Sequence, residues 1–236
     1  MEQHGVQEAY YKSFRDRGQI WVYPKLGGPA FRKPISWCTA ETDFQSEPLE
    51  KAQANTIENH GIKAVWHLLK PGRLSHEQYE LLLKWMALHL TRNPKARTTF
   101  FESNQAYERE FPVEFSRQLF GLQSSYAVAD VYMCNSPQFL VTSDNPVLEF
   151  DIEHGGKSIL IVPISPSKFV QLSSDGRRWH HEERTVEELI NAMICASAFK
   201  YIFSHQGDFS ITRCKENAES FNIVPVLETQ SLSPLL

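Results

Sequence analysis

The sequence feature that most constrains the fold is the run Leu81–Leu90, which is apolar on nearly all sides of a helix. The run follows Ser75-His76-Glu77-Gln78, a capping box in which two side chains satisfy backbone N–H groups at a helix start. Pro94 ends the helical pattern. A helix without a polar face is stable only where other elements surround it, so we expect this helix in the middle of the molecule.

Helical spacing also appears on both sides of this run. Apolar residues recur at helical intervals from Ser46, which can cap a helix, to Pro71, and Gly61 between them predicts a kink or break. The aromatic-rich segment 98–125 predicts one or two more helices, with an interruption near Pro112. These segments together predict a group of helices around the central one.

Strand patterns lie at the two ends of the chain. Ile20–Tyr23 and residues 31–35 flank Gly27-Gly28 and predict an N-terminal hairpin. Near the C-terminus, a capping box at Thr185–Glu188 opens an amphipathic helix that we expect to pack on a sheet. The strands of that sheet are predicted as the antiparallel pairs 128–134 with 138–141 and 159–164 with 169–172, and as closing strands at 201–204 and 209–212.

The predicted fold class is α+β, with an N-terminal hairpin and a central helical bundle packed on a mostly antiparallel C-terminal sheet. The chain has 236 residues, 42% of them hydrophobic, and no long linker, which favours a single compact domain over residues 1–236. Within it we expect an extended segment at 1–45, a helical part at 46–125 and the sheet with one packing helix at 126–236.

Composition and motifs exclude several classes of protein. No window is apolar enough to cross a bilayer, so we expect no membrane contact, and the N-terminus lacks a secretory pattern, which favours a cytoplasmic location. The net charge of −4 argues against coating of a nucleic-acid duplex. The four cysteines are scattered without a Cys-x-x-Cys pair, so we expect reduced thiols and no zinc site.

A group of small polar residues, Thr142–Asn145, follows an apolar run and stops at Pro146. The structural interpretation is a turn, because Asn145 precedes a proline and Asp or Asn side chains fold onto their own backbone. The functional interpretation is that a strand end presents Asp144 as a base, a hydrogen-bond acceptor or a metal ligand, with Ser143 and Asn145 beside it. The residue types leave both interpretations open.

A second polar group lies at the end of the central helix. His89 and Arg92 are three residues apart and share one helix face, and Arg97 follows closely. Cations at this position complement the partial negative charge of a helix C-terminus, which is a sufficient structural reason for them. Arginine also forms paired hydrogen bonds with carboxylate or phosphate, which makes these residues candidates for substrate binding.

A third group consists of Glu41 and Asp43, which are two residues apart in an extended segment. Carboxylates at this spacing point the same way and can hold a divalent cation or share a proton. Solvated charges in a loop are the structural alternative.

Several of these residues coincide with motifs of a known family. The chain resembles the bacterial and phage family called domain of unknown function 4238 in separated motifs that follow the same order. The matching positions are His4, Tyr10 and Phe14; Glu41 and Phe44; Arg92, Pro94 and Arg97; Thr142 to Pro146; and Pro163, Ser165 and Pro166. Gln7 and Tyr11 depart from the family's proline and leucine. The family has no settled activity, so the resemblance implies a common fold and a common polar pocket but no reaction.

The sequence and the resemblance together predict one shared polar pocket, because convergent polar groups mark binding sites. Its catalytic candidates are His4, Glu41, Asp144 and Asn145, and its substrate-binding candidates are His89, Arg92, Arg97 and Ser143. Such a set suits nuclease-like hydrolysis of a phosphodiester or nucleotide in a toxin or phage-defence setting, with a divalent cation as an optional cofactor. The alternative is a non-catalytic module that binds an anionic small molecule or a partner peptide. The partners expected on either interpretation are an anionic small molecule or a nucleic acid. Oligomeric state is left open.

Overall fold

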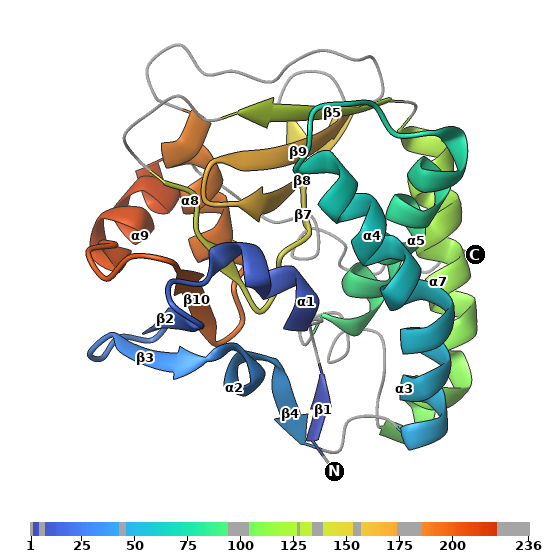
Figure 1. The fold of residues 1–236 in the computed structure, drawn as a ribbon, viewed down its shortest axis with the longest axis horizontal. Coiled ribbons are helices and arrows are strands. Elements are labelled where there is room, and N and C mark those ends of the chain that lie inside the picture. Colours follow the sequence, from blue (N-terminus) through green and yellow to red (C-terminus); the bar gives the residue numbers. More distant parts are fainter. Residues whose placement is uncertain are drawn as a thin grey trace, which may run out of the picture.

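The computed structural model describes residues 2–4, 8–42, 46–93, 104–126, 128–133, 139–152, 157–173 and 186–220. Its helices and antiparallel strands confirm the predicted α+β class (Figure 1). The helices of residues 47–125 gather on one side of the molecule, and most strands lie on the other side. No helix of the described ranges combines the length and apolar character that crossing a membrane requires.

The N-terminal part contains the predicted hairpin together with short helices that the sequence patterns did not indicate. Strand β2 (Gln19–Pro24) pairs antiparallel with β3 (Phe31–Pro34), which confirms the hairpin. Gly27 and Gly28 lie in the connection with φ of 102° and 119°, backbone angles that favour glycine. The other elements are β1 (Glu2–His4), α1 (Glu8–Tyr11), the 3₁₀ helix η1 (Lys12–Phe14), α2 (Ile35–Thr39) and β4 (Ala40–Thr42).

The central helix forms as predicted. Helix α5 (His76–Arg92) begins with the capping box, in which the Gln78 N–H donates to Ser75 Oγ at 3.2 Å and the Ser75 N–H donates to Gln78 Oε1 at 2.8 Å. Helix α7 (Asn104–Ser125) packs beside it. The interruption predicted near Pro112 is wrong, because α7 continues through this exposed proline.

The helical stretch before α5 is continuous but changes its winding. It consists of α3 (Glu47–Gln53), the π-helix η2 (Ala54–Glu58) and α4 (Asn59–Leu68). Ser46 occupies the N-cap position, but its side chain makes no capping hydrogen bond. The sequence predicts a kink or break at Gly61, and the break is absent, because α4 continues through this glycine. A Cβ atom at Gly61 would lie 2.4 Å from Trp85 Cβ, so this glycine lets α4 and α5 approach closely.

The strands of the C-terminal part belong to two separate sheets. One sheet has the order β5-β9-β8-β7, formed by Val128–Met133, Lys168–Ser173, Lys157–Ser165 and Leu148–Ile152. The second has the order β3-β2-β10-β6, in which β10 (Tyr201–Ser204) and β6 (Thr142–Ser143) extend the N-terminal hairpin. All of these pairs are antiparallel.

Several strand predictions need correction. Segment 159–164 does pair with 169–172, but 128–134 pairs with β9 rather than with 138–141. Within the described residues, 139–141 are irregular and lead into β6. The strand predicted at 209–212 is wrong, because α9 (Ile211–Ser220) begins there with Ser210 Oγ accepting the Arg213 N–H at 3.3 Å. Its short apolar alternation imitates a strand where a capped helix starts.

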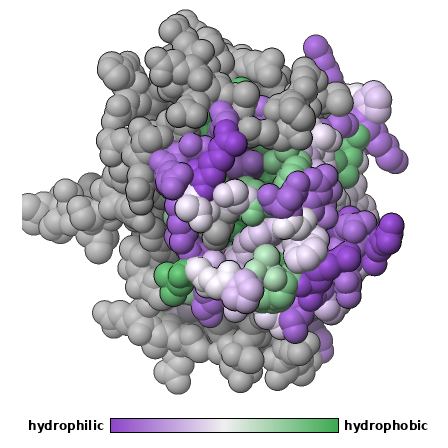
Figure 2. Space-filling view, turned by 90° about the vertical axis from the view of Figure 1, so that its left-hand side faces the viewer, coloured by the Kyte–Doolittle hydropathy of each residue, from purple (hydrophilic) through white to green (hydrophobic). Residues whose placement is uncertain are grey.

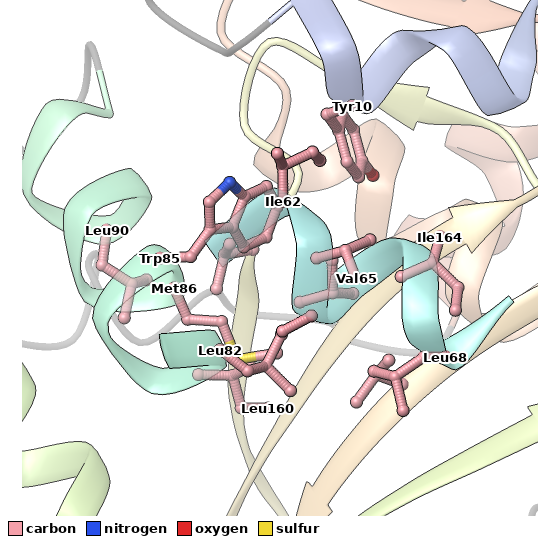
Figure 3. Close-up of a cluster of buried hydrophobic side chains, with 14 of the residues drawn as sticks. Tyr10, Ile62, Val65, Leu68, Leu82, Trp85, Met86, Leu90, Leu160 and Ile164 are labelled. Atoms are coloured by element: carbon pink, nitrogen blue, oxygen red, sulfur yellow. The ribbon is translucent and has the colours of Figure 1, made fainter. Parts of the chain in front are cut away.

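The apolar core contains two main clusters. The larger one joins α1, α4, α5, β8 and β9, and Figure 3 shows Trp85 among Tyr10, Ile62 and Met86 in its centre. The second packs α8 (Val186–Ser197) on β7, β8 and β10. The expectation of reduced thiols is wrong for two of the cysteines, because Cys195 of α8 and Cys214 of α9 form a disulfide. Cys38 is free, and burial raises its pKa to about 12. Cys134 and the Thr185 capping box lie outside the described residues.

Candidate functional site

The Asp144 side chain accepts hydrogen bonds from a neighbouring turn. Its Oδ1 accepts from the Phe199 N–H at 2.8 Å, and its Oδ2 accepts from the Lys200 and Tyr201 N–H groups at 2.6 and 3.0 Å. Phe199 and Lys200 lie in the turn between α8 and β10, and Tyr201 is the first residue of β10. A carboxylate that receives three backbone N–H bonds is well stabilised in place, so Asp144 fixes this turn.

The residues beside Asp144 also make hydrogen bonds within the chain. Ser143 Oγ donates to the Asn145 carbonyl at 2.9 Å and accepts the Asn145 N–H at 3.1 Å. The Asn145 side-chain amide donates to the Ser197 carbonyl at 3.2 Å, and its Oδ1 has no hydrogen-bond partner among the described residues. We call the segment Thr142–Asn145 with these contacts the Asp144 turn. Its hydrogen bonds are those of a structural junction between β6, α8 and β10.

The other predicted catalytic residues lie in a two-stranded ribbon. Strands β1 and β4 pair antiparallel, with His4 opposite Ala40 and Glu41 opposite Gln3. The backbone register therefore does not place His4 directly opposite Glu41. Arg97 and Asp43 lie outside the described residues.

His89 and Arg92 lie at the C-terminal end of α5, and both are buried. Their exposed fractions are 2% and 1%. The Arg92 guanidinium forms a salt bridge and hydrogen bond with Glu58, the last residue of the π-helix η2. The His89 ring contacts Trp85 at a centroid distance of 4.2 Å. The spacing of His89 and Arg92 predicts a shared helix face, but no sequence pattern indicates Glu58 or Trp85 as their neighbours.

Two tyrosines of α1 stand between this end of α5 and the Asp144 turn. Tyr10 donates its hydroxyl proton to the Pro163 carbonyl and hydrogen-bonds Thr142 Oγ1 at 2.8 Å, while its ring contacts Trp85 at 5.5 Å. Tyr11 donates to the Ser143 carbonyl at 3.0 Å. Aromatic side chains therefore connect the two polar regions.

Several buried polar atoms around α5 have no hydrogen-bond partner among the described residues. They are Nδ1 and Nε2 of His89, Nε1 of Trp85, and both side-chain polar atoms of Gln53. We call Gln53, Glu58, Trp85, His89 and Arg92 the α5 cluster. Each buried polar atom without a partner costs about 1–3 kcal/mol. Five such atoms would together cost as much as the whole stability of an ordinary domain, so we expect ordered water or a bound group to satisfy them.

The helix before α5 positions two members of the α5 cluster. Gln53 ends α3, and Leu49 and Ile57, four residues to either side of it, pack with Leu88 in a small apolar cluster. Gln53 is 3% exposed and shares this buried side of the helix. Glu58, the last residue of the π-helix that follows, pairs with Arg92. Single π-turns inside longer helices are rare and are frequent at functional sites.

Burial also sets the charge of the α5 cluster. It lowers the pKa of His89 to about 3, with the nearby Arg92 charge as the second cause, so the imidazole is neutral at physiological pH. Glu58 balances the charge of Arg92. The described part of the cluster is therefore neutral overall, and it combines hydrogen-bond donors with acceptors.

The described residues contain no group of three His, Cys, Asp or Glu side chains close enough to hold a metal ion. The comparisons with known proteins do not add a relative: no family model matches the chain, no curated protein is similar to it, and no solved structure matches it. The choice of the α5 cluster as the candidate site therefore depends only on the geometry of the described residues. No sequence motif indicates Gln53, Glu58 or Trp85, because each lies in an ordinary helical pattern.

Proposed function

We propose that the chain binds a small, uncharged polar group at the α5 cluster, such as an amide or the edge of a nucleobase. The observation that supports it is the set of buried polar atoms on Gln53, Trp85 and His89 that have no partner among the described residues. Trp85 Nε1 can only donate, Gln53 can donate and accept, and a neutral His89 offers one donor and one acceptor. A ligand with both kinds of group satisfies this set.

The charge balance separates this ligand class from a bare anion. A phosphate or carboxylate only accepts hydrogen bonds, so it would leave the acceptor atoms of Gln53 and His89 without partners. Arg92 is paired with Glu58, which reduces its attraction for a further anion. The α5 cluster therefore suits recognition of a nucleoside or nucleotide through its base better than recognition of a free phosphate.

The second candidate is hydrolysis of a nucleotide or phosphodiester, and the observation that favours it is the neutral state of His89. The lone pair of the neutral imidazole can accept a hydrogen bond from an attacking water and orient it, although its low pKa makes it a weak base, and Arg92 beside it can stabilise developing negative charge. With this candidate we also propose that the chain is related to the family called domain of unknown function 4238. We further propose a cytoplasmic location and a role in a toxin or phage-defence system.

Thermal unfolding of the full chain with adenosine, guanosine, cytidine, uridine and their monophosphates tests the binding proposal. We expect at least one nucleoside to raise Tm by about 5 °C at a hundredfold excess over its Kd. The substitution His89→Leu, similar in size but without ring nitrogens, should abolish the shift. Chromatography of the monophosphate mixtures, and of a mixture with a dinucleotide that contains a phosphodiester bond, detects hydrolysis.

Two results together would reject binding at the α5 cluster. One is a panel in which no nucleoside or nucleotide changes Tm. The other is mass spectrometry of the denatured, freshly purified protein that detects no released small molecule. Binding without any turnover would reject the hydrolase and leave the binding module.

A further inference from the structure

A pocket of about 260 Å³ lies between α8, α9 and the turn that follows β10. Its lining includes Phe139 and Phe209 as aromatic groups, Glu188, Asp208 and Arg213 as charged groups, and Cys214. These residues belong neither to the α5 cluster nor to the Asp144 turn. Figure 2, which views the molecule from the side on which α9 lies in Figure 1, shows a largely hydrophilic described surface with small hydrophobic areas.

The walls of this pocket are held in place by bonds within the chain. The disulfide between Cys195 and Cys214 joins α8 to α9, the two helices that border the pocket. The Asn191 side chain donates to the Phe139 carbonyl at 2.9 Å. On the opposite side, Tyr23 Oη accepts the Phe209 N–H at 3.2 Å. The pocket is therefore preformed, which lowers the entropic cost of binding a ligand.

The charges of the lining favour a cation. Glu188 is nearly buried and pairs with Arg213 at 2.9 Å, so these two charges balance each other. Asp208 is exposed and forms no ion pair with any residue in the described ranges. The three charged side chains thus leave one net negative charge, beside two aromatic rings. An organic ammonium is attracted both by a carboxylate and by the faces of aromatic rings.

We propose that this pocket binds a small organic cation, an ammonium group carried on an apolar or aromatic body. Asp208 supplies the counter-charge, and Phe139 and Phe209 contact the apolar body. The volume suits a molecule the size of a single amino-acid side chain rather than a peptide or a nucleic acid. The pocket is independent of the α5 cluster, so either proposal can fail without the other.

The test is calorimetric titration of the full chain, with its disulfide intact, at pH 7.5. The probes are benzylammonium, benzyl alcohol and benzoate, which share a phenyl ring but carry a positive, zero or negative charge. We expect benzylammonium to bind at least about tenfold more tightly than either of the others. Asp208→Asn should weaken benzylammonium binding about three- to tenfold and leave benzyl alcohol unchanged.

A matched control separates the pocket from general surface charge. Glu216→Gln removes an exposed carboxylate from α9 that does not line the pocket, and benzylammonium affinity should stay within about twofold of the wild type. Phe209→Leu keeps apolar bulk but removes the ring, so it should weaken benzylammonium binding more than benzyl alcohol binding. Each variant is first checked for an unchanged Tm.

The proposal is overturned if benzoate or benzyl alcohol binds as tightly as benzylammonium, if Asp208→Asn and Glu216→Gln have equal effects, or if benzylammonium does not bind. At high salt, Asp208→Asn should weaken benzylammonium binding less than at low salt, because salt screens the attraction between an exposed carboxylate and the ammonium group. If Asp208→Asn lowers Tm, Asp208→Ser replaces it, and the same loss of affinity is expected.

Discussion

The Asp144 turn and the α5 cluster contain similar kinds of residue but differ in how their polar atoms are satisfied. In the Asp144 turn, one carboxylate accepts three backbone N–H bonds, and Ser143 and Asn145 bond to each other. In the α5 cluster, the ring nitrogens of His89 have no hydrogen-bond partner among the described residues. Polar residues that terminate a strand are thus explained by the fold, whereas buried polar atoms without partners point to something outside the fold.

The largest expected effect concerns the ion pair of the α5 cluster. Arg92→Met leaves the Glu58 carboxylate buried without its partner, and we expect a loss of about 4 kcal/mol in the free energy of unfolding. The double variant Arg92→Met/Glu58→Leu removes both charges and should recover most of that loss. Urea denaturation of the single and double variants measures both values. Equal stability of the two variants would show that the pair is not coupled.

The next effect concerns the Asp144 turn. Asp144→Ala removes the acceptor of three backbone N–H groups, and we expect a loss of about 3 kcal/mol. Asp144→Asn keeps one acceptor oxygen and should lose less. The same urea experiments report both, and an unchanged stability of Asp144→Ala would mean that these bonds do not hold the turn.

A pH-dependent effect concerns the buried imidazole of His89. The pKa of His89 is about 3 in the folded chain and 6.5 in the unfolded chain, so between these values the unfolded chain binds a proton that the folded chain does not. Stability is complete above pH 6.5 and falls as the pH drops toward 3. Between pH 7 and pH 4.5 we expect His89 to contribute a loss of about 2.5 kcal/mol.

The matched variant His89→Leu should lose less stability over the same pH range, by about that amount. Measurements of unfolding free energy at pH 7, 5.5 and 4.5 give the difference between the wild type and the variant. Parallel curves would mean that the pKa of His89 is the same in the folded and the unfolded chain, which its burial opposes.

A steric prediction concerns how α4 meets the α5 cluster. Gly61→Ala places a methyl group 2.4 Å from Trp85 Cβ, so the two helices must separate. We expect a loss of about 2 kcal/mol, as in other overpacked cores. Gly121→Ala on α7 is the control, because its Cβ meets nothing within 4 Å and alanine favours a helix. Equal effects of the two changes would contradict close packing at Gly61.

The smallest effect has the opposite sign. Gln53→Met keeps the length of the side chain but removes two buried polar atoms without partners, so in ligand-free protein we expect a gain of about 1 kcal/mol. Asn191→Leu is the contrast, because the Asn191 side chain bonds the backbone of Phe139 and Val141 and its removal should be destabilising. Destabilisation by Gln53→Met would show that Gln53 already has a partner within the protein.

The sequence predicted the parts of the fold that depend on local signals. The Ser75 capping box and the N-terminal hairpin are specified by residues a few positions apart, and both are present. The pairing of Arg92 with Glu58, 34 positions away, depends on how two helices pack, so no local pattern reveals it. The same applies to the Cys195–Cys214 disulfide and to β10 joining the N-terminal hairpin.

The candidate site was predictable in part for the same reason. His89 and Arg92 stand out because they are polar residues in an otherwise apolar helix, and a helix face is a local property. Asp144 was equally conspicuous, but its three bonds to residues 199–201 can be recognised only in the folded chain.

The most direct test of the central claim compares the ligand-induced Tm shift of three proteins: the wild type, His89→Leu and Asp144→Asn. For a nucleoside that stabilises the wild type, the account predicts no shift in His89→Leu and a wild-type shift in Asp144→Asn. Loss of the shift in Asp144→Asn with a full shift in His89→Leu would contradict it and would place the ligand at the Asp144 turn.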